Sequence, residues 1–138
     1  MNVEGAKSFI HDHGDQILDL FLTYQMIEMT LFFKLHLPRL PEVRYADDEL
    51  GEINKELNAK TLGKLKNKYL EKFPNDDYDL KFDLETVAMQ RNSFMHTLWV
   101  VIAMAQDQEK IARVGEIMLD NFGKGVHELL EKIHKLPA

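Results

Sequence analysis

Two side chains with complementary chemistry stand five positions apart in the most apolar part of the chain, Arg91 and His96. The guanidinium of Arg91 is planar and permanently charged, which suits the oxygens of a phosphate. The imidazole of His96 is the kind of group that takes up and releases protons near neutral pH. Asn92, one helical turn before His96, could hold the imidazole or the phosphate. Cleaving RNA without a metal requires a base for the 2′-OH proton, an acid for the leaving oxygen and a cation for the phosphorane.

The helix expected to carry these residues has an uneven distribution of polar side chains. At about 100° per residue, Glu85, Asn92 and His96 fall within roughly 40° of one another, with Met89 interrupting their row. Arg91 points instead in the direction of apolar neighbours: Leu84, Val87 and Leu98. A buried guanidinium costs free energy unless it meets a partner, so we expect a carboxylate from another helix, or a cleft, beside Arg91. On an ideal helix Arg91 and His96 diverge by about 140°, which leaves their convergence to the long arginine stem.

Apolar residues recur at steps of three and four along most of the chain, which predicts helices and no significant strand. The expected helices cover about 3–11, 15–35, 48–57, 60–73, 83–106 and 108–135, and the stretches 48–57 and 60–73 could form one broken helix. Prolines and polar residues predict a loop over 37–43 and a turn over 74–77, and Gly123 and Gly125 could kink the last helix. Short connections favour one domain over residues 1–138, an all-α, up-and-down helical bundle of four to five helices.

Composition excludes several classes of protein. The chain has 138 residues, no cysteine and a formal net charge of −6. Disulfides, thiolate zinc sites and cysteine nucleophiles are therefore absent, and the acidic balance argues against general nucleic-acid binding. The first residues lack the pattern of a secretory signal, and no apolar run approaches the roughly 20 residues of a membrane span. We expect a cytoplasmic protein with no membrane partner.

Three further groups of residues are candidate binding sites. Lys64, Lys66 and Lys68 belong to a locally basic segment that could guide an RNA backbone, although a solvated helix face is its more ordinary interpretation. The His11-Asp12-His13 cluster and the pair Glu131 and His134 have too few well-spaced ligands for a metal site. The sequence predicts neither a metal nor a cofactor.

The six residues from Arg91 to His96 resemble the motif of the HEPN superfamily (higher eukaryotes and prokaryotes nucleotide-binding domains). That motif has an arginine followed by four to six residues and a histidine, with a polar residue favoured after the arginine. The segment Thr61 to Leu65 resembles one that precedes the motif in many members. Glu28 occupies the kind of place where members often carry an acidic residue. The helix order is similar over most of the chain.

The resemblance implies a metal-independent endoribonuclease in which Arg91 and His96 are catalytic and Asn92 supports them. Glu28 and Glu85 would be supporting acids. Members commonly dimerise so that two motifs line one cleft, and the apolar surroundings of the motif would suit that interface: Phe94, Met95, Leu98 and Trp99. The resemblance also implies an RNA substrate and the possibility of a toxin, in a toxin–antitoxin or defence system, held by a cognate antitoxin protein.

Other interpretations of the same residues stay open at this point. His96 could be a buried histidine bonded to Asn92 or to a neighbouring helix, and Arg91 could simply pair with a carboxylate at the edge of the core. Glu28 could be an ordinary carboxylate at the core edge. The chain would then be a non-catalytic module for dimerisation or partner binding, or would bind a nucleotide without cleaving it.

Overall fold

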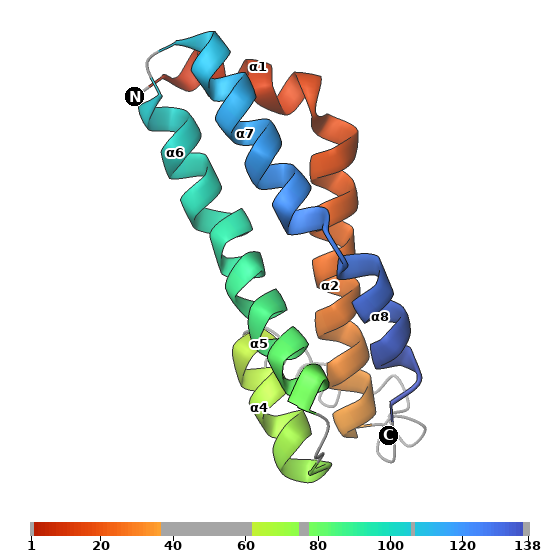
Figure 1. The fold of residues 1–138 in the computed structure, drawn as a ribbon. Coiled ribbons are helices and arrows are strands. Elements are labelled where there is room, and N and C mark those ends of the chain that lie inside the picture. Colours follow the sequence, from red (N-terminus) through yellow and green to blue (C-terminus); the bar gives the residue numbers. More distant parts are fainter. Residues whose placement is uncertain (1, 37–61, 75–77, 106, 137–138) are drawn as a thin grey trace, which may run out of the picture.

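In the computed structural model, α1 (Val3–Asp12) crosses one end of a helical bundle and α2 (Gly14–His36) runs along its length (Figure 1). The structure describes residues 2–36, 62–74, 78–105 and 107–136. Asn2 caps α1, because its side chain accepts a hydrogen bond from the Gly5 N–H at 2.8 Å. The Asn2 N–H donates a hydrogen bond to the Ala103 carbonyl at 2.7 Å, which ties the start of α1 to the helix that ends at Met104.

The middle of the chain forms a short helix and a long rod. The short helix is α4 (Leu62–Lys72), which packs against α2 and the start of the rod. The rod consists of α5 (Tyr78–Asn92), the π-helical segment η2 (Ser93–Thr97) and α6 (Leu98–Met104), and it runs from one end of the bundle to the other (Figure 1). The predicted helix over 83–106 is therefore present, with an earlier start and a widened turn inside it.

The C-terminal part differs from the prediction of one helix over 108–135. It forms α7 (Gln108–Gly123) and α8 (Val126–His134), separated at Gly125. Lys124 is extended after the end of α7, and Gly125, with φ of 75°, adopts a left-handed conformation that turns the chain into α8. The glycines that were expected to kink a helix thus divide it. Asp107 caps α7 by accepting the Lys110 N–H at 2.7 Å.

The all-α fold class is confirmed: the described residues form helices and no strand. The helices predicted over 3–11, 15–35 and 60–73 match α1, α2 and α4 within one or two residues at each end. The helix predicted over 48–57 and the proline loop before it lie outside the described residues. None of the described helices is long and apolar enough to span a membrane.

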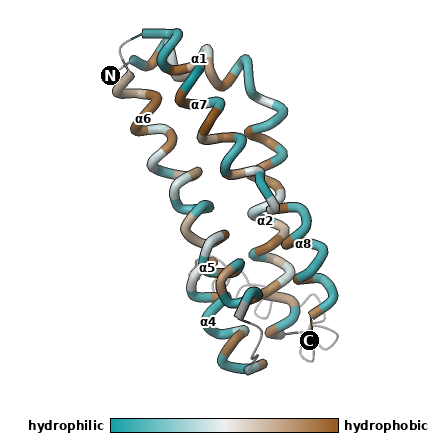
Figure 2. The backbone as a smooth tube through the Cα atoms, viewed as in Figure 1, coloured by the Kyte–Doolittle hydropathy of each residue, from teal (hydrophilic) through white to brown (hydrophobic). Residues whose placement is uncertain are grey.

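The core lies between α2, the rod and the C-terminal helices. Figure 2 shows hydrophobic and hydrophilic residues alternating along each helix, as expected for helices with one buried face. Phe94 is at the centre of an aromatic cluster, with ring centroids 5.6 Å from Tyr24, 6.1 Å from Phe122 and 6.3 Å from Trp99. The Tyr24 hydroxyl donates to the Phe122 carbonyl at 3.2 Å, and burial raises the pKa of Tyr24. This cluster fixes the rod against α2 next to Arg91.

Candidate functional site

Arg91 and Glu28 form an ion pair between the rod and α2. Arg91 Nε lies 3.0 Å from Glu28 Oε1, and the two side chains are only 19% and 13% exposed. The sequence predicted a carboxylate from another helix beside Arg91, because Arg91 points toward apolar neighbours. Glu28 on α2 is that carboxylate. Glu28, singled out through the family resemblance, is therefore beside Arg91 in space although 63 residues separate them in the sequence.

The electrostatics of this pair are unbalanced. Burial raises the pKa of the Glu28 carboxyl above its ordinary value, and the guanidinium of Arg91 only partly counteracts that effect. Glu28 Oε1 is buried and accepts no well-directed hydrogen bond from the described residues, despite its short distance to Arg91. The attraction between Arg91 and Glu28 is therefore mainly Coulombic. The Arg91 guanidinium keeps donors that Glu28 does not use.

The outer end of the guanidinium reaches the surface. Arg91 Nη1 donates to Asn92 Oδ1 over 3.4 Å, a long and weak bond, and Asn92 is exposed. Arg91 thus extends from a half-buried contact with Glu28 to a solvated edge of the rod. A guanidinium held at one end and free at the other can bind an anionic oxygen that approaches from solvent.

His96 lies in the π-helical segment η2, and its side chain is exposed. Its ring forms no hydrogen bond, ion pair or ring contact with any residue that the structure describes. The interpretation of His96 as a buried, hydrogen-bonded histidine is therefore wrong. The imidazole is open to solvent and both ring nitrogens are available.

The remaining predicted site residues lie farther from this group along the fold. Glu85 is exposed on α5, nearly two helical turns before Arg91. On α4, Lys64 and Lys68 share a face because they are four residues apart, whereas Lys66 points about 160° away and is half-buried. Both Lys64 and Lys68 take part in interactions within the fold. The structure therefore joins Arg91, Glu28 and Asn92 directly and leaves the three lysines on a neighbouring helix.

Two of the four predicted interface residues around the motif are not at the surface. Phe94 and Leu98 are almost fully buried in the chain's own core, and Met95 and Trp99 are partly buried against it. Phe94 and Leu98 cannot form a dimer interface without unfolding the core, so the prediction is wrong for these two, and for Met95 and Trp99 it stays a prediction. Exposed apolar residues occur instead on the outer face of the rod, where Met89 is 71% exposed and Val100 is 61% exposed.

Sequence reasoning missed a larger apolar surface on α2. Its five residues are spaced at steps of four, four, three and four, and each is 42–55% exposed: Leu18, Leu22, Met26, Met29 and Phe33. One flank of α2 meets α7 and α8 through Gln16, Asp19 and Lys34. Another flank meets the rod through Tyr24 and Glu28. The α2 stripe, as we name these five residues, lies on the third side, and Glu28 stands between it and the core.

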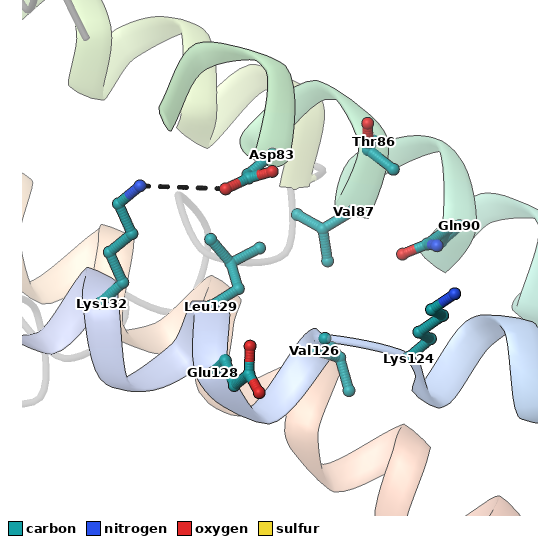
Figure 3. Close-up of a pocket in the computed structure, with 10 residues that line it drawn as sticks. Asp83, Thr86, Val87, Gln90, Lys124, Val126, Glu128, Leu129 and Lys132 are labelled. Atoms are coloured by element: carbon teal, nitrogen blue, oxygen red, sulfur yellow. Dashed lines mark ion pairs between the residues drawn. The ribbon is translucent and has the colours of Figure 1, made fainter. Parts of the chain in front are cut away.

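A groove of about 370 Å³ lies elsewhere, between α5 and the start of α8 (Figure 3). Lys132 pairs with Asp83 at 3.9 Å at one end, and Gln90 and Lys124 lie at the other end (Figure 3). Its lining combines apolar residues with both signs of charge and includes neither Arg91 nor His96. This groove therefore adds nothing to the chemistry of the Arg91 group.

Histidines at the opposite end of the bundle have separate partners. His13 Nε2 is 3.6 Å from Glu116, whereas His11 Nδ1 is 3.7 Å from its neighbour Asp12. Within the described ranges, no three His, Asp or Glu side chains come together in a way that could hold a metal ion.

Comparisons of the chain with protein-family models, curated proteins and solved structures found no match. A functional conclusion therefore depends on the geometry around Arg91 and on the resemblance of its motif.

Proposed function

We propose that the chain is a metal-independent endoribonuclease of the HEPN type, with Arg91 and His96 as its catalytic residues. One observation carries the proposal: a guanidinium held by Glu28 at the core edge, five residues before an imidazole that is exposed and unpaired within the described fold. A structural arginine would explain the ion pair but would leave the adjacent free histidine without a role.

The proposed reaction uses the 2′-hydroxyl of RNA as its nucleophile. An imidazole nitrogen of His96 removes the 2′-OH proton while the oxygen attacks the adjacent phosphorus. Arg91 donates hydrogen bonds to the non-bridging oxygens as negative charge accumulates on the phosphorane. The P–O5′ bond then breaks, and an imidazolium donates a proton to the leaving oxygen. The products are a 2′,3′-cyclic phosphate and a 5′-hydroxyl.

Glu28 and Asn92 have positioning roles in this proposal. Glu28 fixes the Nε side of the guanidinium, so that its outer nitrogens face the solvated edge of the rod. Asn92 is bonded to Nη1 only weakly, at 3.4 Å, and a phosphate oxygen would replace that contact without a large loss. A guanidinium oriented before substrate arrives has less reorganisation to undergo in the transition state.

Two protons must move in the reaction, which favours two histidines at one site. A homodimer would provide the second, with His96 as base and the partner subunit's His96 as acid. The α2 stripe supports a second copy as the occupant, because its spacing of four and three residues is that of a helix that packs against another helix. Met89 and Val100 add exposed apolar area on the rod.

Lys64 and Lys68 would contact the RNA backbone on either side of the cleaved bond. Helix α4 packs against α5, the helix that carries Arg91. The net charge of −6 limits general affinity for RNA. Such weak general binding would suit an enzyme whose activity in a cell, as a toxin, is restrained by a partner antitoxin protein.

A non-catalytic dimerisation module is the second candidate. The α2 stripe favours it, because five exposed apolar residues on one helix need a partner whether or not the chain is an enzyme. The ion pair between Arg91 and Glu28 would then be a structural contact at the core edge.

Incubation of the purified protein with a single-stranded RNA in EDTA distinguishes these candidates. We expect cleavage by the wild type and loss of cleavage in Arg91→Ala and His96→Ala. The matched controls are Arg113→Ala on α7 and His11→Ala on α1, which remove an exposed arginine and an exposed histidine elsewhere. No cleavage by the wild type, or equal loss in a control and its matched variant, would leave the dimerisation module as the better account.

A further inference from the structure

The π-helical segment η2 begins two residues after Arg91 and contains His96. Within it, the Leu98 N–H donates to the Ser93 carbonyl, five residues earlier, in place of the four-residue step of an α-helix. The backbone before and after this turn is α-helical. The rod therefore contains one more residue in this turn than a regular helix would have.

This extra residue changes where His96 points. In a regular α-helix, residues five apart diverge by about 140°, so Arg91 and His96 would face different sides of the rod. Each step through a turn that closes after five residues advances the chain by less than the 100° of an α-helix. Three of the five steps from Arg91 to His96 fall within η2, so the two side chains diverge by less than the 140° of a regular helix.

We propose that η2 is a positioning device that turns His96 toward the Arg91 guanidinium. The inference deepens the proposed function and rests on it for its catalytic meaning. It replaces the expectation that the length of the arginine stem alone would bring the two groups together. Resemblance of the motif to a family pattern says nothing about this turn, which is a property of the backbone of this chain.

The surrounding packing holds the widened turn in place. Phe94, inside η2, is 2% exposed within the aromatic cluster, and Leu98, directly after η2, is fully buried. The two side chains are four residues apart on one face of the rod, and their burial anchors both ends of the widened turn to the core. Removal of one residue from η2 would restore a regular α-helix and keep α5 and α6 in their present registers.

Two single-residue deletions separate the position of His96 from the integrity of the helix. Deletion of Met95 leaves Arg91 and His96 four residues apart, about 40° in an α-helix, so they stay on one side. Deletion of Thr97 leaves them five residues apart, about 140°, so His96 faces away from Arg91. Met95 is partly buried and Thr97 is exposed, so the first deletion is the more destabilising of the two.

We expect activity to follow the opposite order from stability. In EDTA with single-stranded RNA, the Met95 deletion keeps cleavage within about tenfold of the wild type, whereas the Thr97 deletion loses about 10²-fold or more, as His96→Ala does. Circular dichroism establishes that both variants are folded. Equal cleavage by the two folded deletions, or loss of cleavage in both, would overturn the inference.

A metal clamp tests the same geometry without depending on activity. In Arg91→His, the widened turn would bring the imidazoles at positions 91 and 96 closer in direction than a regular helix does, so that they could chelate Ni²⁺ as histidines one turn apart do on an α-helix. We expect Ni²⁺ to raise the melting temperature of this variant by about 4 °C. Ni²⁺ should not raise the melting temperature of the double variant Arg91→His with His96→Ala. This control lacks one of the two imidazoles but keeps Glu28, so it shows whether Glu28 alone can supply the second ligand.

The two readouts separate the two proposals. A wild type that cleaves no RNA, together with an Arg91→His variant stabilised by Ni²⁺, would refute the nuclease and retain the geometry of η2. Absence of any Ni²⁺ effect on Arg91→His would refute the positioning role, whatever the activity of the wild type.

Discussion

The junction of α1 with α7 and the middle of the rod differ in how their side chains are used. At the junction, Phe9 is 2% exposed and packs directly onto Gly115, where a Cβ would come within 2.3 Å of the ring. In the middle of the rod, Arg91 and Glu28 are partly buried charges and His96 is exposed beside a widened turn. The junction contributes packing alone, whereas the middle keeps polar groups that packing does not require. Changes at the first region should lower stability, and changes at the second should lower activity.

The largest expected effect is that of His96→Ala on cleavage. Loss of a general acid–base group lowers the rate by about 10²–10⁴-fold. The side chain is exposed and unpaired within the described fold, so the free energy of unfolding should change by no more than about 0.5 kcal/mol. Initial cleavage rates and a urea melt measure the two quantities. A destabilised but active His96→Ala protein would remove the contrast between the two regions.

The next effect is that of Gly115→Ala on stability. The new methyl group overlaps the Phe9 ring, and such overpacking costs about 1–3 kcal/mol. Cleavage per folded molecule should remain at the wild-type level. Phe9→Leu in the same chain removes the overlapping ring atoms and should recover part of the loss. A Gly115→Ala chain as stable as the wild type in urea would show that this junction is loosely packed.

A third effect concerns the α2 stripe. Leu22→Lys with Met29→Lys places two charges in the surface proposed to meet a second copy, and both side chains are about half exposed in one chain. We expect the mass in solution to fall from dimer to monomer with less than about 1 kcal/mol lost per folded chain. Sedimentation measures the mass, and Ile117→Lys, at another exposed apolar position, is the control. Wild type that is already monomeric would contradict the proposed dimer.

The smallest effect is a pH dependence at Glu28. Because its pKa is raised in the folded chain, mainly by burial, the unfolded chain ionises first as the pH rises above about 4.5. The folded state then loses relative stability until Glu28 ionises there as well. The stability of the wild type relative to Glu28→Gln should therefore be greatest near pH 4 and decrease above it. Urea melts from pH 4 to pH 7 measure it, and an increase with pH would show that the Arg91 charge outweighs burial.

Much of this fold follows from the sequence, because each helix buries one face at regular spacing. The division at Gly125 did not follow, since a glycine in a helical pattern is compatible with a kink or with a left-handed end. The π turn did not follow either, because the apolar spacing of Phe94 and Leu98 is equally compatible with a regular α-helix.

The site was predictable in its residue types and less so in its geometry. The apolar direction of Arg91 required a partner, and the structure identifies that partner as Glu28. Exposure of His96 was one of two interpretations that the sequence left open, since its row holds Glu85 and Asn92 but also the apolar Met89. The α2 stripe escaped notice because α2 is apolar on two faces, and periodicity alone does not distinguish a buried face from an exposed one.

The chemistry of cleavage gives the most direct test of the central claim. Two oligonucleotides of one sequence, one all-RNA and one with 2′-deoxyribose throughout, are incubated with the protein in EDTA, and the product ends are identified by mass spectrometry. The account predicts a 2′,3′-cyclic phosphate and a 5′-hydroxyl from the RNA, and no cleavage of the deoxy strand. Equal cleavage of both strands, or an intact RNA, would contradict it.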